Sequence, residues 1–426
     1  MSARTIEQHR QAVATLLAPL FEHRATEPLA LSSSRLNADP DAYRGRTLAA
    51  AVHSPVSLPP FDNSQMDGYA VRAADLAAAG TDTPVLLTVA GRINAGDPGS
   101  ALAAGTAAPI MTGAPIPAGA DAVVPIERAD PPRFLPADSE QSVRFFAPVS
   151  PGTFVRLVGS DVTAGAELLP AGAALGPAQF GLLAGTGVTL ISVRRRIRVL
   201  LIATGHEIRE PGVDLAPGQI YDSNSVILSQ ALHDAGCTVF ARPCRSDDAA
   251  DLTALLAAAA EIDLVVTVGG VSAGAREVVR DALGPLGVEF AHVAMQPGGP
   301  QGLGEITLPG PGARPRVPVV TFPGNPVSAL ISFEVFLRPV LRAVAGLARP
   351  ERPRLQAPLA AELHSPADKH QLRRGILRPD GTLDLVGGPS SHLLHSYAAA
   401  TVLVHVPVGV DRIAAGEPAD YWSIDD

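Results

Sequence analysis

The 426-residue chain has little cysteine, little lysine and no long apolar run, and each scarcity argues against a class of protein. Cys237 and Cys244 have neither CxxC spacing nor a histidine pattern, so nothing indicates a zinc site and two reduced thiols are expected. Lys369 is the only lysine, so arginine provides the other 32 of the 33 basic residues. The formal net charge of −9, without a long basic cluster, argues against nucleic acid as the main partner.

No apolar stretch approaches the roughly 18 residues that a membrane-spanning helix needs. Residues 1–17 are polar and lack the apolar core of a secretory signal. We therefore expect a cytoplasmic protein without a membrane partner. Hydrophobic residues make up 46% of the chain, which supports well-buried cores. The length is too great for one ordinary core, so roughly two to four domains are expected.

The pattern of expected secondary structure changes twice along the chain, from β-rich to alternating α/β and back to β-rich. The expected domains are residues 1–190, with a β-rich module inserted at about 55–158, residues 191–346 and residues 347–426. The first begins with a helix over residues 5–20, and the last returns to β texture after a linker at 347–358. A small barrel or sandwich is expected for the last.

Strand and helix patterns alternate between these two β-rich regions. Strands are expected at 197–202, 238–241, 264–268 and 288–293, helices at 225–234, 249–260, 276–283 and 327–344, and a hairpin-like segment precedes the last helix. Alternation of this kind predicts a doubly wound parallel sheet, with ligand-binding loops at the carboxyl edge of its strands.

Three strands of this block end in small residues that leave the backbone accessible. The sequences are TGHE at 204–207, GGVSAG at 269–274 and PGNP at 323–326. Main-chain N–H groups at such ends can hold an anion, so together the three loops predict one phosphate-bearing ligand. Taken singly, each also suits a structural role: a solvated loop, a tight turn, and a rigid turn whose second proline starts a helix.

Several carboxylates lie near these loops. Glu207 can ligate Mg²⁺ or polarise a hydroxyl or water. Glu277 is expected in the first turn of a helix, where it also stabilises the helix dipole. Asp247 and Asp248 precede the helix at 249–260 and suit an N-cap pair. In the N-terminal half, the Asp67 and Thr112 segments match no general nucleophile, metal or nucleotide motif and suit structural turns.

Eight ordered blocks resemble the molybdopterin molybdenumtransferase family, called MoeA in bacteria. They are PPFDNSQMDGYAVR, IMTGAPIPAGADAVVPIE, GSDVTAGAELL, LIATGHEI, PGQIYDSNS, VVTVGGVSAG, AMQPGGPQG and FPGNPVSA, and SSHLLHSYAAATVLV resembles the family's C-terminal domain. The E domains of gephyrin and of the plant molybdenum-insertion protein are the eukaryotic relatives. The resemblance covers almost the whole chain.

The resemblance implies a multidomain fold with a central MoaB/Mog-like α/β domain, β-rich N-terminal domains and a small C-terminal β-barrel. It implies an elongated homodimer whose active site forms between the α/β domain of one subunit and the Met-Asp-Gly-Tyr module of the other. The implied reaction converts adenylylated molybdopterin and molybdate into molybdenum cofactor and AMP, with Mg²⁺ assisting. Molybdopterin adenylyltransferase and cofactor-receiving enzymes are further expected partners.

The motif match also places roles on particular residues. The expected catalytic residues are Asp67, Asp247 and Glu207, and Glu207 and Glu277 are expected to hold Mg²⁺. The expected substrate-binding residues are Thr112, Asp161, Thr204, Gly205, Gly269, Gly270, Ser272, Gly274, Pro323, Gly324, Asn325, Pro326 and Ser328.

The sequence also departs from the family pattern. Glu277 and His206 replace the usual aspartates. His292, Gln296 and Gly299 stand where lysines are common, so the cationic character of the pocket is weakened. These losses leave open a pterin-binding paralogue whose metal insertion is weak or tungsten-specific. A scaffold role like that of gephyrin and an adenylyltransferase activity fit less well, because fused domains are absent and the flanking β-rich regions are long.

Overall fold

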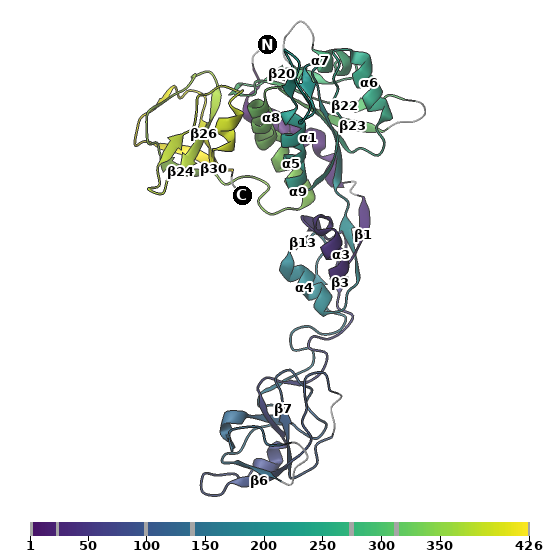
Figure 1. Cartoon of the computed structure of the whole chain (residues 1–426), viewed down its shortest axis with the longest axis vertical. Helices are drawn as coiled ribbons and strands as arrows, with labels where there is room; N and C mark the ends of the chain where they lie inside the picture. Colours follow the sequence, from purple (N-terminus) through teal and green to yellow (C-terminus); the bar gives the residue numbers. More distant parts are fainter. Residues whose placement is uncertain are drawn as a thin grey trace.

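Figure 1 shows an elongated molecule in the computed structural model, which describes residues 3–22, 25–97, 101–136, 141–271, 277–310 and 315–424. The α/β block and the C-terminal barrel lie side by side at one end, and the β-rich module lies at the other end, beyond a narrower middle region. Within the described ranges, no helix has the length and apolarity to cross a membrane.

The first helix, α1 (Ile6–Leu17), begins with a capping box, in which Thr5 and Gln8 each bond the other's backbone N–H. It ends at Ala18, and a short helix, α2 (Pro19–Glu22), follows. Val13 and Leu17 are buried in the core of the α/β block. The helix predicted over 5–20 is therefore confirmed with a break. It packs against the α/β block, which is distant from it in the sequence.

The middle region consists of short paired segments around its own small core. Its strands pair as β1 (Thr26–Ala30) with β14 (Leu190–Arg194), β2 (Arg46–Thr47) with β13 (Ala174–Leu175), and β3 (Val52–His53) with β12 (Glu167–Leu169), all antiparallel. Helices α3 (Ser33–Ala38) and α4 (Pro177–Gly185) accompany them. The segment that leads to the β-rich module and the segment that returns from it therefore pair with each other in this region.

The β-rich module contains a six-stranded sheet in the order β8-β5-β7-β6-β10-β9. The strands are β5 (Gly68–Val71), β6 (Val85–Val89), β7 (Thr106–Ile110), β8 (Ala122–Pro125), β9 (Ala129–Asp130) and β10 (Ser142–Phe145). A separate pair, β4 (Asn63–Ser64) with β11 (Val155–Arg156), joins the two ends of the module. Tyr69 and Phe145, both almost fully buried, pack edge-to-face in its core.

The α/β block has a six-stranded sheet in the order β18-β15-β19-β23-β22-β20. The strands are β15 (Ile197–Ala203), β18 (Cys237–Ala241), β19 (Leu264–Val268), β20 (Glu289–His292), β22 (Pro300–Thr307) and β23 (Arg316–Phe322). The first four in this order are parallel, and β22 and β20 add an antiparallel edge. The predicted hairpin is the β22–β23 pair, so the sheet is mixed rather than wholly parallel.

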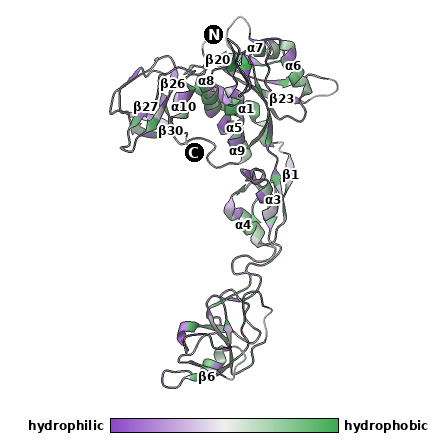
Figure 2. Ribbon diagram, viewed as in Figure 1, coloured by the Kyte–Doolittle hydropathy of each residue, from purple (hydrophilic) through white to green (hydrophobic). Residues whose placement is uncertain are grey.

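Helices cover both faces of this sheet. Helices α5 (Ser223–Asp234), α8 (Pro326–Ser332) and α9 (Arg338–Ala345) share one core with α1, whereas α6 (Ala249–Ala258) and α7 (Val278–Leu283) share the other. Figure 2 shows hydrophobic residues along β23 and α8. The block is therefore doubly wound, as predicted.

The helix predicted over 327–344 is not one regular α-helix. A π-helical turn, Phe333–Leu337, separates α8 from α9. Pro339 has no N–H, and its ring opposes the carbonyl four residues earlier, so the helix widens ahead of it.

The C-terminal region forms a small closed barrel. The sheet order is β21-β26-β28-β30-β24, with β27 beside β26. Its strands are β24 (Leu355–Pro358), β26 (His370–Leu377), β27 (Leu383–Leu385), β28 (Val402–Val406) and β30 (Pro418–Ser423). A bridge between Leu359 and Leu383 closes the ring. The linker predicted through residue 358 therefore ends before Leu355.

The barrel is joined to the α/β block through β21 (Met295–Gln296), which pairs in parallel with β26. Met295 lies opposite His370 and Gln296 opposite Gln371. This pairing brings the barrel to the edge of the sheet where the predicted ligand loops end.

Candidate functional site

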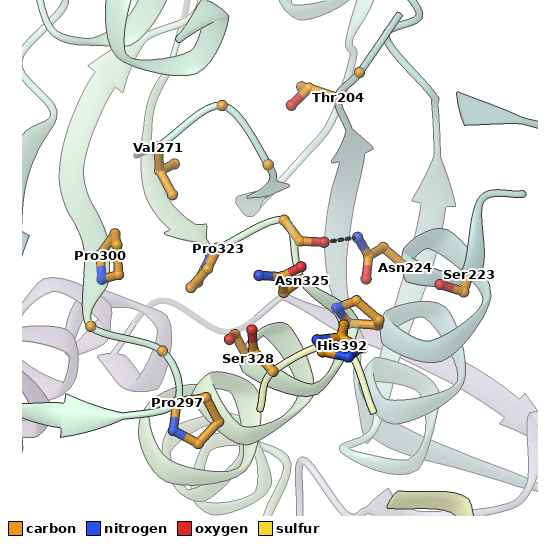
Figure 3. Close-up of a pocket in the computed structure, with 18 of the residues that line it drawn as sticks. Thr204, Ser223, Asn224, Val271, Pro297, Pro300, Pro323, Asn325, Ser328 and His392 are labelled. Atoms are coloured by element: carbon orange, nitrogen blue, oxygen red, sulfur yellow. Dashed lines mark hydrogen bonds between the residues drawn. The ribbon is translucent and has the colours of Figure 1, made fainter. Parts of the chain in front are cut away.

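A cavity of about 1040 Å³ lies at the carboxyl edge of the parallel strands. Its walls are the loops that follow β15, β19 and β23, the first turn of α5, the segment from His292 to Pro300, and residues of the barrel. Figure 3 shows Thr204, Val271, Pro323 and Asn325 arranged around it, with His392 on the barrel side. The three strand ends predicted to share one ligand therefore do meet at one cavity.

Close backbone packing joins the three loops. Gly269 and Gly270 have φ of 93° and 64°, which favour glycine. A Cβ on Gly269 would lie 2.8 Å from the Thr204 carbonyl oxygen, and one on Gly324 would lie 3.2 Å from the Gly269 Cα. Side chains at these glycines would separate the loops, so their absence holds the backbone close around the cavity.

Not every N–H at these strand ends is available to a ligand. Thr204 donates to the Val268 carbonyl at 2.9 Å, Gly205 to the Cys244 carbonyl at 3.1 Å, and Gly269 to the Phe322 carbonyl at 3.0 Å. Among the described residues, the amides of Gly270, Gly324 and Asn325 have no such partner. The expectation that Thr204 and Gly205 expose N–H groups is therefore wrong, because both amides continue the sheet. Ser272 and Gly274 lie outside the described residues.

The PGNP turn begins a helix, as predicted. Asn325 is the N-cap of α8, Pro326 occupies its first turn, and the buried Ser328 follows. Asn224, in the first turn of α5, donates from Nδ2 to the Gly324 carbonyl at 2.7 Å, as Figure 3 shows. This bond fixes the turn against α5.

Acidic side chains gather at the TGHE end of the cavity. His206 Nδ1 lies 3.1 Å from Asp247 Oδ2 and 3.7 Å from Glu207 Oε2, so it stands between two carboxylates. Asp248 alone caps α6, accepting from the Ala250 N–H at 2.9 Å, which leaves Asp247 for the cavity. The predicted N-cap pair is therefore a single cap.

Glu277 also lines the cavity, from the residue before α7 rather than from its first turn. The described residues contain no cluster of three or more His, Cys, Asp or Glu that would hold a metal by itself. Mg²⁺ commonly binds to one or two carboxylates together with water and substrate phosphates. Glu207 and Glu277 supply that donor chemistry once a phosphate-bearing ligand is present.

The three positions where lysines were expected all line the same cavity. The ring of His292 lies over Gly299, where a Cβ would be 2.5 Å from its Cε1. Gln296 Oε1 accepts a hydrogen bond from Gln371 Nε2 at 2.7 Å. None of the three residues provides the permanent charge of a lysine ammonium on this wall.

Lys369, which sequence reasoning did not place in the site, lines the cavity from the barrel. Ser390, Ser391 and His392 accompany it, and Asn224 was also missed. Among the described residues, the Lys369 ammonium forms no ion pair, so its charge is available to a ligand. Its rarity was a usable signal, since a chain that otherwise uses arginine keeps one lysine here.

Asp67, Thr112 and Asp161 do not line this cavity. All three are exposed. Asp67 and Thr112 belong to the β-rich module at the opposite end of the molecule (Figure 1), and Asp161 lies in the segment that leads back from it, where its N–H donates to the Leu58 carbonyl. Asp67 and Thr112 form a second cluster, in which the Thr112 N–H and Oγ1 both donate to Asp67 Oδ1 at 2.7 Å. These bonds, the backbone one first, lower the pKa of Asp67, which stays ionised.

Three family models match the chain in order. They describe the MoeA N-terminal region (domain I and II) over residues 4–187, a probable molybdopterin binding domain over 200–343 and the MoeA C-terminal region (domain IV) over 356–424.

Similar proteins cover nearly the whole chain. Molybdopterin molybdenumtransferase 2 of Mycobacterium tuberculosis (strain ATCC 25618 / H37Rv) is 43% identical, over 99% of this chain and 100% of its own length. The molybdopterin molybdenumtransferase of Synechococcus elongatus is 35% identical, over 89% and 92%. The crystal structure of a molybdopterin biosynthesis MoeA protein from Pyrococcus horikoshii matches with a TM-score of 0.77 and 29% identity, over 100% of both chains.

Proposed function

Since this chain belongs to the MoeA family, whose curated members are named molybdopterin molybdenumtransferases, we propose that it inserts molybdenum into adenylylated molybdopterin. The products are molybdenum cofactor and AMP, and the reaction depends on Mg²⁺. One observation carries this proposal: a single cavity unites three strand-end loops, four carboxylate residues (Glu207, Asp222, Asp247 and Glu277) and the chain's one lysine. Action in the cytoplasm, without a membrane partner, is part of the same proposal.

The loops suit the phosphate groups of the substrate. The amides of Gly270, Gly324 and Asn325 are unpartnered among the described residues, and the two glycines have no side chains of their own to cover their N–H groups. Backbone N–H groups of this kind bind phosphate oxygens without reorganisation. We assign the pyrophosphate and the pterin phosphate to these loops.

The carboxylates suit the departing group. Glu207 and Glu277 would hold Mg²⁺, which supplies positive charge to the AMP phosphate as the phosphoanhydride bond breaks. Asp247, whose Oδ2 lies 3.1 Å from His206 Nδ1, orients groups beside them. Lys369 is the cation positioned to attract molybdate.

The Asp67–Thr112 cluster joins the reaction only if a second copy supplies it. Its distance from the cavity within one chain favours a homodimer whose sites combine two subunits (Figure 1). Mixing Asp67→Ala protein with Glu207→Ala protein should restore AMP release, since one site of each mixed dimer keeps both residues. Inactivity of the mixture, with subunit exchange demonstrated, would place each complete site within one chain.

The direct test supplies purified protein with adenylylated molybdopterin, Mg²⁺ and either molybdate or tungstate. AMP release with molybdate, lost in Asp67→Ala, is the expected result. The lack of lysine at His292, Gln296 and Gly299 favours a second candidate, a pterin-binding paralogue that inserts metal weakly or prefers tungsten. Tight pterin binding without AMP release, or release with tungstate alone, would establish that candidate instead.

A further inference from the structure

A chain of side-chain hydrogen bonds runs from the barrel into the wall of the cavity. Arg373 Nη1 donates to Gln371 Oε1 at 3.4 Å, and Gln371 Nε2 donates to Gln296 Oε1 at 2.7 Å. The pairing of β21 with β26 places Gln296 directly opposite Gln371. Gln371 is only 2% exposed, whereas Gln296 lines the cavity.

The chemistry of these groups fixes the direction of every bond in this chain. A guanidinium can only donate, so the Gln371 atom that faces Arg373 must be its oxygen. The NH₂ of Gln371 then faces Gln296, and the Gln296 atom that receives it must also be an oxygen. The assignment of O and N in each amide therefore follows from the cation at the far end.

The Gln296 NH₂ group remains available to a ligand. The Gln296 oxygen accepts from Gln371, and within the described ranges Nε2 of Gln296 has no hydrogen-bond partner. A side chain on this wall thus offers donors only. Without Arg373, the two amides would be equally stable in the reversed orientation, and Gln296 would offer an acceptor instead.

We propose that Arg373 and Gln371 are positioning residues, which hold the Gln296 amide as a hydrogen-bond donor to a tetrahedral oxyanion in the cavity. Identifying that oxyanion as molybdate rests on the proposed function. No carboxylate forms an ion pair with Arg373 among the described residues, so its charge is not cancelled locally. Burial lowers the pKa of Arg373, in keeping with its desolvated position.

A purely structural reading of the same contacts makes a different prediction. Arg373 also donates to the Gly387 carbonyl at 3.4 Å, and so it supports the loop that leads to the cavity residues of the barrel. If the amide pair only fastened the barrel to β21, its loss would lower stability and leave oxyanion affinity unchanged. The two roles are therefore separated by measuring both quantities.

Gln371→Glu is the decisive variant. A carboxylate at 371 accepts from Arg373 and from Gln296 but cannot donate, so the Gln296 amide must reverse and turn its oxygen to the cavity. A hydrogen bond to a charged group is lost, and the Kd for molybdate, measured by titration calorimetry on the full chain, should rise about tenfold or more. The KM for molybdate in AMP release should rise similarly, with kcat changed far less.

The reversal can be repaired by a second change. Adding Gln296→Lys to Gln371→Glu should restore molybdate affinity to within a few-fold of wild type, because an ammonium at 296 donates both to the new carboxylate and to the oxyanion. Gln356→Glu is a matched control: Gln356 lies on β24 of the same barrel, donates to Asp420 at 2.8 Å and does not line the cavity. It should leave the Kd unchanged.

Each outcome decides the matter. Wild-type affinity in folded Gln371→Glu protein, or no binding of molybdate, tungstate or phosphate by the wild type, overturns the inference. Should Gln371→Glu fail to fold, Gln296→Met decides: it removes the donor to the oxyanion together with the oxygen that accepts from Gln371 Nε2, and it should weaken binding about tenfold. If the affinities follow the predicted order but the wild type does not release AMP, the positioning role of Arg373 and Gln371 is supported and the proposed function is refuted. If the wild type releases AMP and Gln371→Glu does so with an unchanged KM for molybdate, the proposed function is supported and the positioning role is refuted.

Discussion

Acid should destabilise this protein through His9, a histidine buried within α1. His9 is 0% exposed, and its ring packs edge-on against Phe336 with centroids 4.6 Å apart. In the described part of the chain, neither ring nitrogen has a hydrogen-bond partner. Burial, and secondarily the charge of Arg4, lower the pKa of His9 from 6.5 to about 4.

The sign of the effect follows from these two pKa values. Below pH 6.5 the unfolded chain binds a proton at His9, but the folded protein binds one only near pH 4. The free energy of unfolding is therefore unaffected above pH 6.5 and falls as the pH drops through this window. Since one pKa unit corresponds to about 1.36 kcal/mol, the loss at about pH 4.5 should be about 2–3 kcal/mol.

Urea unfolding, followed by Trp422 fluorescence, measures this loss. Trp422 is the only tryptophan and shares one core with Val13 and Leu17 of α1. The wild type and His9→Leu are compared at about pH 7.5 and about pH 4.5. The variant should lose about 2–3 kcal/mol less on acidification than the wild type.

The comparison isolates His9 from two other buried histidines. Burial also lowers the pKa values of His370 and His405, but both are present in each protein and their contributions cancel in the difference. An equal acid-induced loss in wild type and variant would refute the reasoning, because the folded pKa of His9 would then lie near its ordinary value.

Substitutions at four positions address the site. Asp67→Ala should abolish AMP release and leave the melting temperature almost unchanged, because Asp67 is exposed; a large fall in melting temperature would make it structural. Lys369→Ala should raise the KM for molybdate about tenfold and Lys369→Arg should largely preserve it, as steady-state kinetics would show; equal effects would mean that charge is not what matters. Gly299→Ala should displace the ring of His292, seen as a change in its imidazole NMR signals; unchanged signals would contradict the 2.5 Å approach. Gly270→Val should weaken pterin binding and also cost about 1–3 kcal/mol of stability, because φ is 64°; calorimetry and melting together test both, and unaltered pterin affinity would remove this loop from the site.

Much of the α/β block was predictable because its signals are local. β19 was predicted at its observed bounds, since a β-branched run followed by two glycines indicates both a strand and its end. Pro326 likewise marked the start of α8. The π-turn before Pro339 was not foreseen, because a proline inside an apolar helical pattern is compatible with an ended helix or a distorted one.

The composition of the cavity was only partly predictable, because two of its features depend on pairing between distant segments. Lys369 and His392 reach the cavity through the pairing of β21 with β26, which joins residues some seventy-five positions apart. The amides of Gly205 and Gly269 bond to the carbonyls of Cys244 and Phe322, so they are engaged although their sequence suggested otherwise. Neither fact has a signature within either segment alone.

The same pairing brings positive charge to the cavity, although His292, Gln296 and Gly299 provide no permanent charge. Positive charge reaches it from the barrel instead: directly as the Lys369 ammonium, and indirectly as the Arg373 guanidinium that orients Gln371 and Gln296. Because Lys369 and Arg373 belong to the barrel side of the cavity, their charges reach it only while the barrel stays paired with β21. Substitutions that loosen the barrel should therefore weaken oxyanion affinity before they unfold the α/β block, whereas in a cavity whose cations lay on the sheet side the two losses would be independent.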